Sequence, residues 1–318
     1  MNEIRRGETN SVVLARMCTA LAVVLSVAGF YLPLVSSIIF LLIPLPIAYL
    51  GMKEGASWAV IVLFGVMVLD SLFFGIISAA FLCAIFGMLG VVMGICYRNR
   101  VSAQVTLIVG AVVVLAALVG EALAAFYVLN MPQVLFGGEM IDRMESQMLA
   151  QMGSMYTGEL LVQAEANVHA MMDVIRKSIP FAAVAAALFY SWASMTLGKK
   201  VFRRLGITDI PVLPPLERWE FPRLFVGLYI LVVLSSYFIK DNEMVSLLSY
   251  NGGLICTFVF WLQGLAVLWW FPRKYPVMKP FRWVVAVLSA FVGYVQLFVV
   301  LMGMADLLLR YRKKRNYE

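Results

Sequence analysis

The sequence predicts an all-α protein, a polytopic transmembrane helical bundle of eight or nine spans with an extracytoplasmic amphipathic helical hairpin. Three observations predict this class. Hydrophobic residues make up 63% of the 318 residues and charged residues only 14%, whereas soluble domains are about half apolar and about a quarter charged. The apolar residues gather in runs of about 20 or more, the length that a helix needs to cross about 30 Å of hydrocarbon. None of these runs alternates between apolar and polar residues, as the strands of a membrane barrel do.

Nine apolar runs, ending near charged residues, proline or glycine, are the predicted spans. They are 11–31, 33–51, 56–75, 77–97, 102–130, 178–197, 221–239, 245–271 and 283–309. Residues 56–97 form one tract that is too long for a single crossing, and Phe73–Phe74–Gly75 is the predicted turn within it. The chain is therefore expected to divide into a five-span membrane region (1–130), the hairpin segment (131–177) and a second membrane region with basic loops and tail (178–318).

Basic loops predict the orientation of the chain, because loops rich in Lys and Arg stay in the cytoplasm. The N-terminus carries three arginines, and the loops after the second, fourth and sixth runs are basic as well, so the N-terminus is expected inside. Basic residues at 273–282 and again at 310–315 both favour the inside, although one run separates them. One of the last two runs is therefore not a simple crossing: either 245–271, which contains Asn251–Gly252–Gly253, or 283–309, which contains Gly293. Both termini are then cytoplasmic.

The segment between the two membrane regions predicts two amphipathic helices. A stripe of methionines recurs at helical spacing on one face of the first: Met140, Met144, Met148, Met152 and Met155. Gly153 and Gly158 lie near the expected break between the two helices. Such a hairpin is either a cap on the bundle or a lid or partner surface, since methionine-rich faces adapt to varied ligands. The single histidine, His169, has no Cys and no second His nearby, so no metal site is expected.

Ionisable residues inside spans are candidate site residues, because their burial in lipid is costly. Asp70 is expected at mid-membrane or just beyond, and Glu121 in the outer half. Both face one outer cavity if the third and fifth spans are neighbours. For Glu121 the alternatives are binding or proton handling on one hand and structural hydrogen bonding on the other. For Asp70 they are the same functional roles or a place at the wet interface. Gln263, near the midplane, either orients a ligand or holds helices together. Asp306 stands four residues before Arg310, a spacing that predicts an ion pair.

The first span carries a stripe of small side chains that predicts close helix packing. Its members are Ala15, Thr19, Ala22, Ser26 and Gly29. Small residues let helices approach closely in lipid, where packing drives association. The sequence leaves open whether the partner helix belongs to this chain or to another protein.

Recognisable catalytic motifs are absent from the sequence. There is no phosphate-binding Gly-Lys-Ser/Thr loop, no paired-histidine metal motif and no Gly-x-Ser-x-Gly turn. We therefore expect no enzyme, no catalytic residue, no metal and no cofactor, and a transporter of this kind would need a separate ATPase. The net charge of +7 is assigned to anchoring at anionic lipid rather than to nucleic acid.

Several motifs, in this order along the chain, resemble the YybS-like family of uncharacterised bacterial membrane proteins. They are Pro44–Leu45–Pro46, Gly51–Met52–Lys53–Glu54–Gly55, Pro180 at the start of the sixth span, Lys199 to Leu205, Trp219 to Arg223, Gln263 to Ala266 and Gly303 to Asp306. The resemblance implies a place in the bacterial cell membrane. The first six helices of that family resemble the substrate-capture subunits of energy-coupling-factor vitamin importers. By this resemblance Ala15, Ala22 and Ser26 would dock on a coupling subunit, and the ligand would bind near Glu121.

Two functions follow as alternatives. The first is a small-molecule-binding, substrate-capture-like membrane subunit that works with separate coupling and ATPase chains. The second is a non-transporting scaffold of the cell envelope, for which the hairpin and the basic ends are contact surfaces. A proton-coupled carrier using Glu121 and Asp70 is less favoured, because no repeat between the halves is found.

Overall fold

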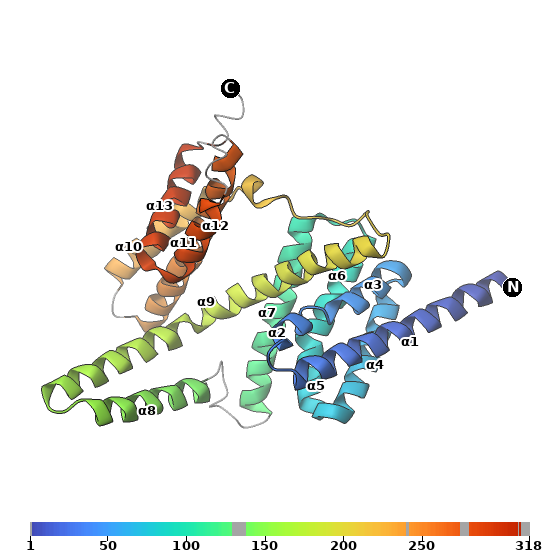
Figure 1. Cartoon of the computed structure of the whole chain (residues 1–318), viewed down its shortest axis with the longest axis horizontal. Helices are drawn as coiled ribbons and strands as arrows, with labels where there is room; N and C mark the ends of the chain where they lie inside the picture. The colour runs from blue at the N-terminus through green and yellow to red at the C-terminus, as the bar shows by residue number, and fades with distance from the viewer. Residues whose placement is uncertain (1, 129–137, 240–241, 274–279, 311, 313–318) are drawn as a thin grey trace. The chain divides into compact units, whose positions relative to one another are not determined.

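The computed structural model describes residues 2–128, 138–239, 242–273, 280–310 and 312, and these residues form helices and connections without a strand (Figure 1). The predicted all-α class is confirmed. The helices are α1 (Asn2–Tyr31), α2 (Ser36–Phe40), α3 (Pro44–Glu54), α4 (Ala56–Phe74), α5 (Ile76–Leu82), the π-helix η1 (Cys83–Gly87), α6 (Met88–Arg98), α7 (Ala103–Tyr127), α8 (Gly138–Met155), α9 (Glu159–Arg204), the 3₁₀ turns η3 (Leu216–Arg218) and η4 (Phe271–Arg273), α10 (Leu224–Phe238), α11 (Glu243–Trp270), α12 (Phe281–Phe291) and α13 (Gly293–Leu309).

By length and hydropathy, seven helical stretches of the described residues can cross a membrane. Five lie before residue 128: Ser11–Tyr31, Ser36–Glu54, Ala56–Phe74, Ile76–Arg98 and Ala103–Tyr127. They match the first five predicted spans. The predicted turn is also present, because α4 ends at Phe74 and Gly75 takes a φ of +82° before α5 begins. A positive φ costs glycine little, which explains why the 56–97 tract divides there.

The C-terminal spans differ from the nine predicted. Helix α10 has 15 residues, about 22 Å of helix, and is shorter than the hydrocarbon thickness. Helix α11 continues through Asn251–Gly252–Gly253 without a break. The predicted run 283–309 instead bends by 113° between α12 and α13. The described residues hold seven long apolar helices, or eight if the bent pair counts as one, and α10 is a shorter apolar helix besides these. Because α12 ends just before Gly293, the break lies in the second of the two runs that the charge pattern had indicated.

Helix α9 runs for 46 residues and contains Pro180. Pro180 was expected at the opening of the sixth span, and the helix that contains it begins 21 residues earlier, at Glu159. The three segments 1–130, 131–177 and 178–318 also differ from the compact units of the structure, because the boundary at 177 falls within α9 and the start of the middle segment lies outside the described residues. Unit 1 comprises residues 1–155 and 182–213, and unit 2 comprises residues 156–181 and 214–318.

Two helices do form in the predicted hairpin segment. Helix α8 ends at Met155, and α9 begins at Glu159. Between them Gly158 has a φ of +64°, so the second of the two glycines predicted near the break lies in the turn. Gly153 is part of α8.

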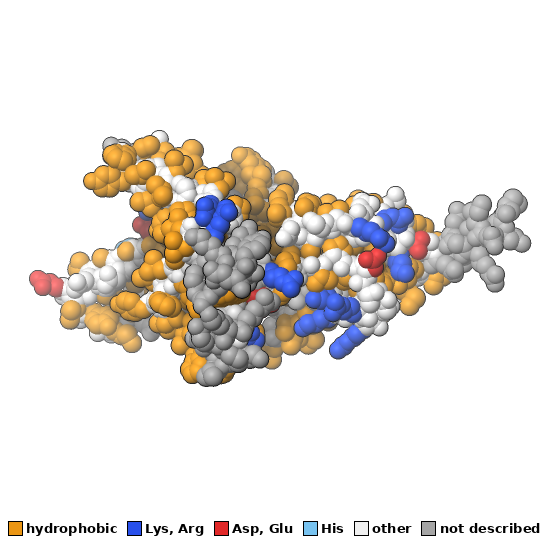
Figure 2. Space-filling model, turned by 90° about the horizontal axis from the view of Figure 1, so that it is seen from above, with side chains coloured by type: hydrophobic (Ala, Val, Ile, Leu, Met, Phe, Trp, Pro, Cys, Tyr) orange, Lys and Arg blue, Asp and Glu red, His pale blue; other side chains and the backbone are white. Residues whose placement is uncertain are grey.

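Unit 1 is built on two pairs of packed helices. Helix α3 packs along α6, and α1 packs along α4, with α7 against α6 and η1. Its core is aliphatic, with residues such as Leu50, Val62 and Leu89 fully buried. In unit 2, α11 packs against both α10 and α13. On the face drawn in Figure 2, hydrophobic side chains cover most of the described surface, and Lys and Arg side chains gather in small patches. Such a surface suits lipid rather than water as solvent.

Candidate functional site

Asp70 is the most deeply buried of the predicted site residues in unit 1. It lies one turn before the end of α4 and is 0% exposed. Neither of its carboxylate oxygens has a hydrogen-bond partner among the described residues. Its polar neighbours are Ser26 of α1 and Cys83 of η1. The Ser26 hydroxyl lies close enough to interact with the carboxylate, but the hydrogen bond of good geometry that it makes goes to the carbonyl oxygen of Ala22, at 3.0 Å. Because buried polar groups are normally paired, Asp70 is an exception that requires an explanation.

Glu121 on α7 is half-buried, and its Oε1 atom is buried without a partner in the described part of the chain. Its neighbour Gly120 faces open space. The condition for a shared cavity with Asp70 was that the third and fifth spans are neighbours. Helices α4 and α7 each pack on α6 and η1 rather than extensively on each other. The structure therefore does not bring the two carboxylates together through direct packing of their helices.

The small-residue stripe of α1 lies inside unit 1. Ala15, Ala22, Ser26 and Gly29 are buried, and α1 packs on α2, α3 and α4. The Thr19 side chain lies against Gly65 of α4, and the Phe40 ring covers Gly29. In this structure the stripe faces helices of its own unit. Its docking role stays a prediction.

One end of unit 1 gathers the loops that the charge pattern places together. The Arg98 guanidinium donates to the Lys53 carbonyl oxygen at 3.0 Å. The Ser11 hydroxyl donates to the Glu54 carboxylate at 2.6 Å. Arg100, in the next connection, forms an exposed ion pair with Asp209 at 2.8 Å. The N-terminal helix and the loops after α3, α6 and α9 therefore lie on one side of unit 1, as an alternating membrane topology requires.

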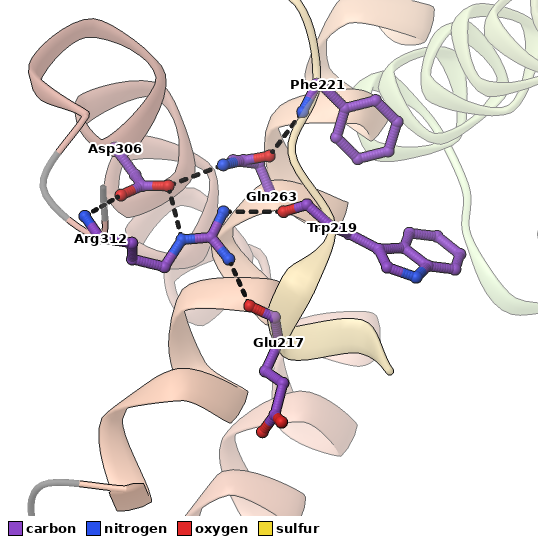
Figure 3. Close-up of polar contacts among 6 residues, drawn as sticks. All are labelled: Glu217, Trp219, Phe221, Gln263, Asp306 and Arg312. Carbon is purple, nitrogen blue, oxygen red and sulfur yellow. Dashed lines mark hydrogen bonds and ion pairs between the residues drawn. The ribbon is translucent and has the colours of Figure 1, made fainter. Parts of the chain in front are cut away.

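Unit 2 contains a buried ion pair that joins three parts of the chain (Figure 3). The Arg312 Nε atom donates to Asp306 at 2.9 Å, and the two side chains are 4% and 6% exposed. The two terminal nitrogens of the guanidinium donate to the backbone carbonyls of Glu217 and Trp219, each at 2.8 Å. Three N–H groups of the guanidinium are thus used, and the backbone N–H of Arg312 also donates to Asp306, at 3.4 Å. Additional bonds of this kind offset the cost of burying an ion pair.

Gln263 belongs to the same network. Its Nε2 donates to Asp306 at 2.6 Å, and its Oε1 accepts from the backbone N–H of Phe221 at 3.2 Å (Figure 3). The amide therefore joins α11 to α13 and to the segment before α10. Among the described residues, these contacts occupy both ends of its amide.

The predicted ion pair between Asp306 and Arg310 is wrong, because Asp306 pairs with Arg312. Helix α13 ends at Leu309, and Arg310 takes a left-handed conformation with a φ of 51°. The chain therefore turns back after the helix, and the helical spacing of four residues no longer applies. Sequence patterns gave no sign of Arg312, since nothing in a basic tail indicates that this arginine folds inward.

A second polar contact of unit 2 was also missed. The Asn251 side chain on α11 reaches the backbone of α9 next to Pro180. Its Nδ2 donates to the Lys177 carbonyl at 2.9 Å, and its Oδ1 accepts from the Phe181 N–H at 2.9 Å. Ser178 and Tyr250 add a hydroxyl contact of 3.2 Å. The sequence signal available was a polar residue inside an apolar run, which was interpreted as a possible helix break.

Comparison with known proteins agrees with the membrane architecture. Residues 20–307 match the model of a family described as a predicted membrane protein (DUF2232). The chain is similar to the uncharacterized protein YybS of Bacillus subtilis (strain 168), with 24% identity over 300 residues, covering 91% of each chain. No solved structure matches the chain.

Proposed function

We propose that the chain, which belongs to the DUF2232 family of predicted membrane proteins, captures a small molecule in the bacterial cell membrane through unit 1. The single observation that supports this proposal is the buried Asp70 carboxylate, which has no hydrogen-bond partner among the described residues. Ionisable groups buried in a membrane are costly and are usually functional. A partner supplied by a ligand explains why such a group is kept.

The chemistry of Asp70 limits the ligand class. A carboxylate accepts hydrogen bonds and attracts positive charge, so the ligand presents N–H or O–H donors or a cationic group. The neighbouring Ser26 hydroxyl is already used as a donor to Ala22, but its oxygen can still accept. Glu121 is proposed to take part in binding through a contact of its own, since α7 does not pack extensively on α4.

In this proposal the protein does not hydrolyse ATP itself. It works with separate coupling and ATPase chains, as the substrate-capture subunits of energy-coupling-factor importers do. In this proposal the N-terminus is cytoplasmic, and α8 with the first part of α9 lies on the extracytoplasmic side. The basic loops at one end of unit 1 support this orientation, because such loops are retained in the cytoplasm.

The test compares wild type with Asp70→Asn, an isosteric change that removes the charge. Native mass spectrometry of the detergent-purified protein reports bound small molecules, and thermal unfolding reports stability. We expect wild type to carry a small molecule that Asp70→Asn lacks. Thermal stability of the ligand-free variant should be unchanged or higher, because the substitution removes an unpartnered buried charge. Glu121→Gln should likewise impair binding and leave the protein folded.

The matched control is Asp209→Asn, which makes the same change at an exposed carboxylate outside the spans. It should retain the bound molecule. Equal small-molecule content in wild type and Asp70→Asn would remove Asp70 from the site. A large loss of stability in the ligand-free Asp70→Asn protein would assign the carboxylate a structural role instead.

A membrane scaffold is the second candidate. The observation that favours it is the methionine stripe of α8, where Met140, Met144 and Met155 are 67%, 40% and 64% exposed. Exposed methionines are suited to adaptable protein contacts. Co-purification of stoichiometric proteins, their loss on changing Met140 and Met144 to Ser, and no bound small molecule would together favour the scaffold.

A further inference from the structure

Two tryptophans and one arginine form a compact cluster at the start of α12. The Arg282 guanidinium carbon lies 5.3 Å from the ring centre of Trp269, at the end of α11, and 6.0 Å from that of Trp283. The two indole rings meet edge to face, with centres 5.0 Å apart. Cation–π contacts of this length hold a guanidinium in place, so the cluster fixes Arg282.

Arg282 has no acidic partner among the described residues. Its Nε atom is buried without a hydrogen-bond acceptor in the part of the chain that the structure describes. An aromatic ring occupies the face of a guanidinium and leaves its N–H donors, which lie in the plane, for a planar or tetrahedral anion. The tryptophans therefore hold the cation, and its Nε donor is not used by any of the described residues.

The start of α12 also favours an anion. Pro280 stands at the N-cap position and provides no side-chain cap for the first backbone N–H groups. Uncapped N–H groups at a helix N-terminus carry partial positive charge. Arg282 belongs to the first turn of α12, so its charge and the helix terminus both favour an anion at this end of the helix.

The surroundings point to a lipid as the source of the anion. Trp283 is 59% exposed, and along the same helix an apolar stripe of Val284, Val287, Leu288 and Phe291 is exposed as well. Tryptophan and arginine are typical of the membrane–water interface. A phosphate bound at Arg282 would let the acyl chains of the same molecule run along this stripe.

We propose that Trp269, Arg282 and Trp283 form a binding site for the phosphate of an anionic phospholipid headgroup. The site lies in unit 2 and is independent of the small-molecule capture proposed for Asp70. It takes the lipid phosphate through the guanidinium edge, and the exposed side of α12 contacts the chains.

The experiment titrates the full-length, delipidated protein in detergent with phosphatidylglycerol or with phosphatidylcholine, and counts retained lipids by native mass spectrometry. Wild type should retain phosphatidylglycerol in preference to phosphatidylcholine. Arg282→Gln should weaken phosphatidylglycerol retention roughly tenfold or more, the effect of losing one charge-assisted contact. The control Arg218→Gln changes an exposed arginine of the same unit and should behave as wild type.

A second variant and a competition with inorganic phosphate test the same site. If Arg282→Gln does not fold, Trp283→Leu, a change at an exposed position, should produce the same selective loss of phosphatidylglycerol. Inorganic phosphate at millimolar concentration should not displace the lipid. Displacement by phosphate would instead indicate a free-anion site, and equal retention of phosphatidylglycerol by wild type and by the folded variant would overturn the proposal.

Discussion

The Asn251 amide oxygen on α11 accepts a hydrogen bond from the backbone N–H of Phe181 on α9 at 2.9 Å. The amide nitrogen of the same side chain bonds the carbonyl of Lys177, four residues earlier in α9. These two backbone groups face each other across one helical turn beside Pro180, whose ring removes a backbone donor and crowds the preceding turn. Asn251 therefore supports α9 at its weakest point, which explains how the helix continues through a proline.

Replacing Asn251 by Leu should destabilise unit 2. The change keeps the branched shape of the side chain and removes both bonds to α9, together with a third bond to the Leu247 carbonyl. The expected loss is about 1–2 kcal/mol of unfolding free energy. Unfolding by SDS, followed by circular dichroism, measures it. Asn99→Leu, which removes an exposed amide at the end of α6, is the control and should have little effect. Equal stability of Asn251→Leu and wild type would contradict the supporting role.

The buried Asp306–Arg312 pair predicts that removing one partner destabilises the protein more than removing both. Arg312→Met leaves a buried carboxylate without its cation and should cost about 3–5 kcal/mol. The double variant Arg312→Met with Asp306→Leu should recover part of this loss, because no buried charge remains. Unfolding curves of the two single variants and the double variant provide the coupling energy.

Arg310→Met is the control for this pair, since Arg310 is exposed and lies beyond the end of α13. It should be neutral. Were Arg310→Met to destabilise the protein as much as Arg312→Met, the ion pair read from helical spacing would be the correct one.

Close approach of α11 and α13 depends on two glycines. A Cβ atom on Gly303 would overlap the Phe260 carbonyl, and one on Gly264 would overlap that of Val299. Gly303→Ala should therefore separate the helices and cost about 1–3 kcal/mol. Gly227→Ala in α10, where nothing lies within 4 Å of the added atom, should be neutral or slightly stabilising. A thermal shift assay in detergent separates the two outcomes.

A helix pair bent by 113°, such as α12 and α13, is either a broken span or a re-entrant segment. Basic residues on both sides of this pair favour a re-entrant segment, with α10 as a crossing. Reporter fusions after residue 280 and after residue 318 should then report the same compartment, the cytoplasm. A fusion after residue 130 should report the opposite side. Opposite compartments for residues 280 and 318 would show that α12 and α13 cross the membrane as one broken span.

Several elements were predictable from the sequence because their cause is local. The first five spans and the turn at Gly75 follow from apolar runs and from glycine's tolerance of a positive φ. The candidate break at Gly293 was visible only as one of two choices, since the charge pattern required a break without locating it. Nothing in the sequence separated Asn251–Gly252–Gly253, which is helical, from Gly293, at which the chain bends.

Partnerships between polar groups were less predictable. Asp306 was assigned to Arg310 by spacing along a helix that ends one residue too early for that spacing to apply. Gln263 was recognised as a polar residue in an apolar run, but its partners lie 42 and 43 residues away. Pro180 was expected at the opening of the sixth span, and nothing in the sequence indicated that an amide from another helix bonds the backbone beside it.

The sequence by itself determined that this protein is a bundle of membrane helices and approximately where most of them begin and end. Lipid offers no hydrogen bonds to the backbone, so each apolar run must satisfy its own backbone as a helix. Only the tertiary structure decided which buried polar groups have partners: Asp306, Arg312 and Gln263 satisfy one another, whereas the Asp70 carboxylate has no partner among the described residues. That difference depends on side chains from other helices that the fold brings close to each group. The spacing of residues along one helix does not reveal those side chains.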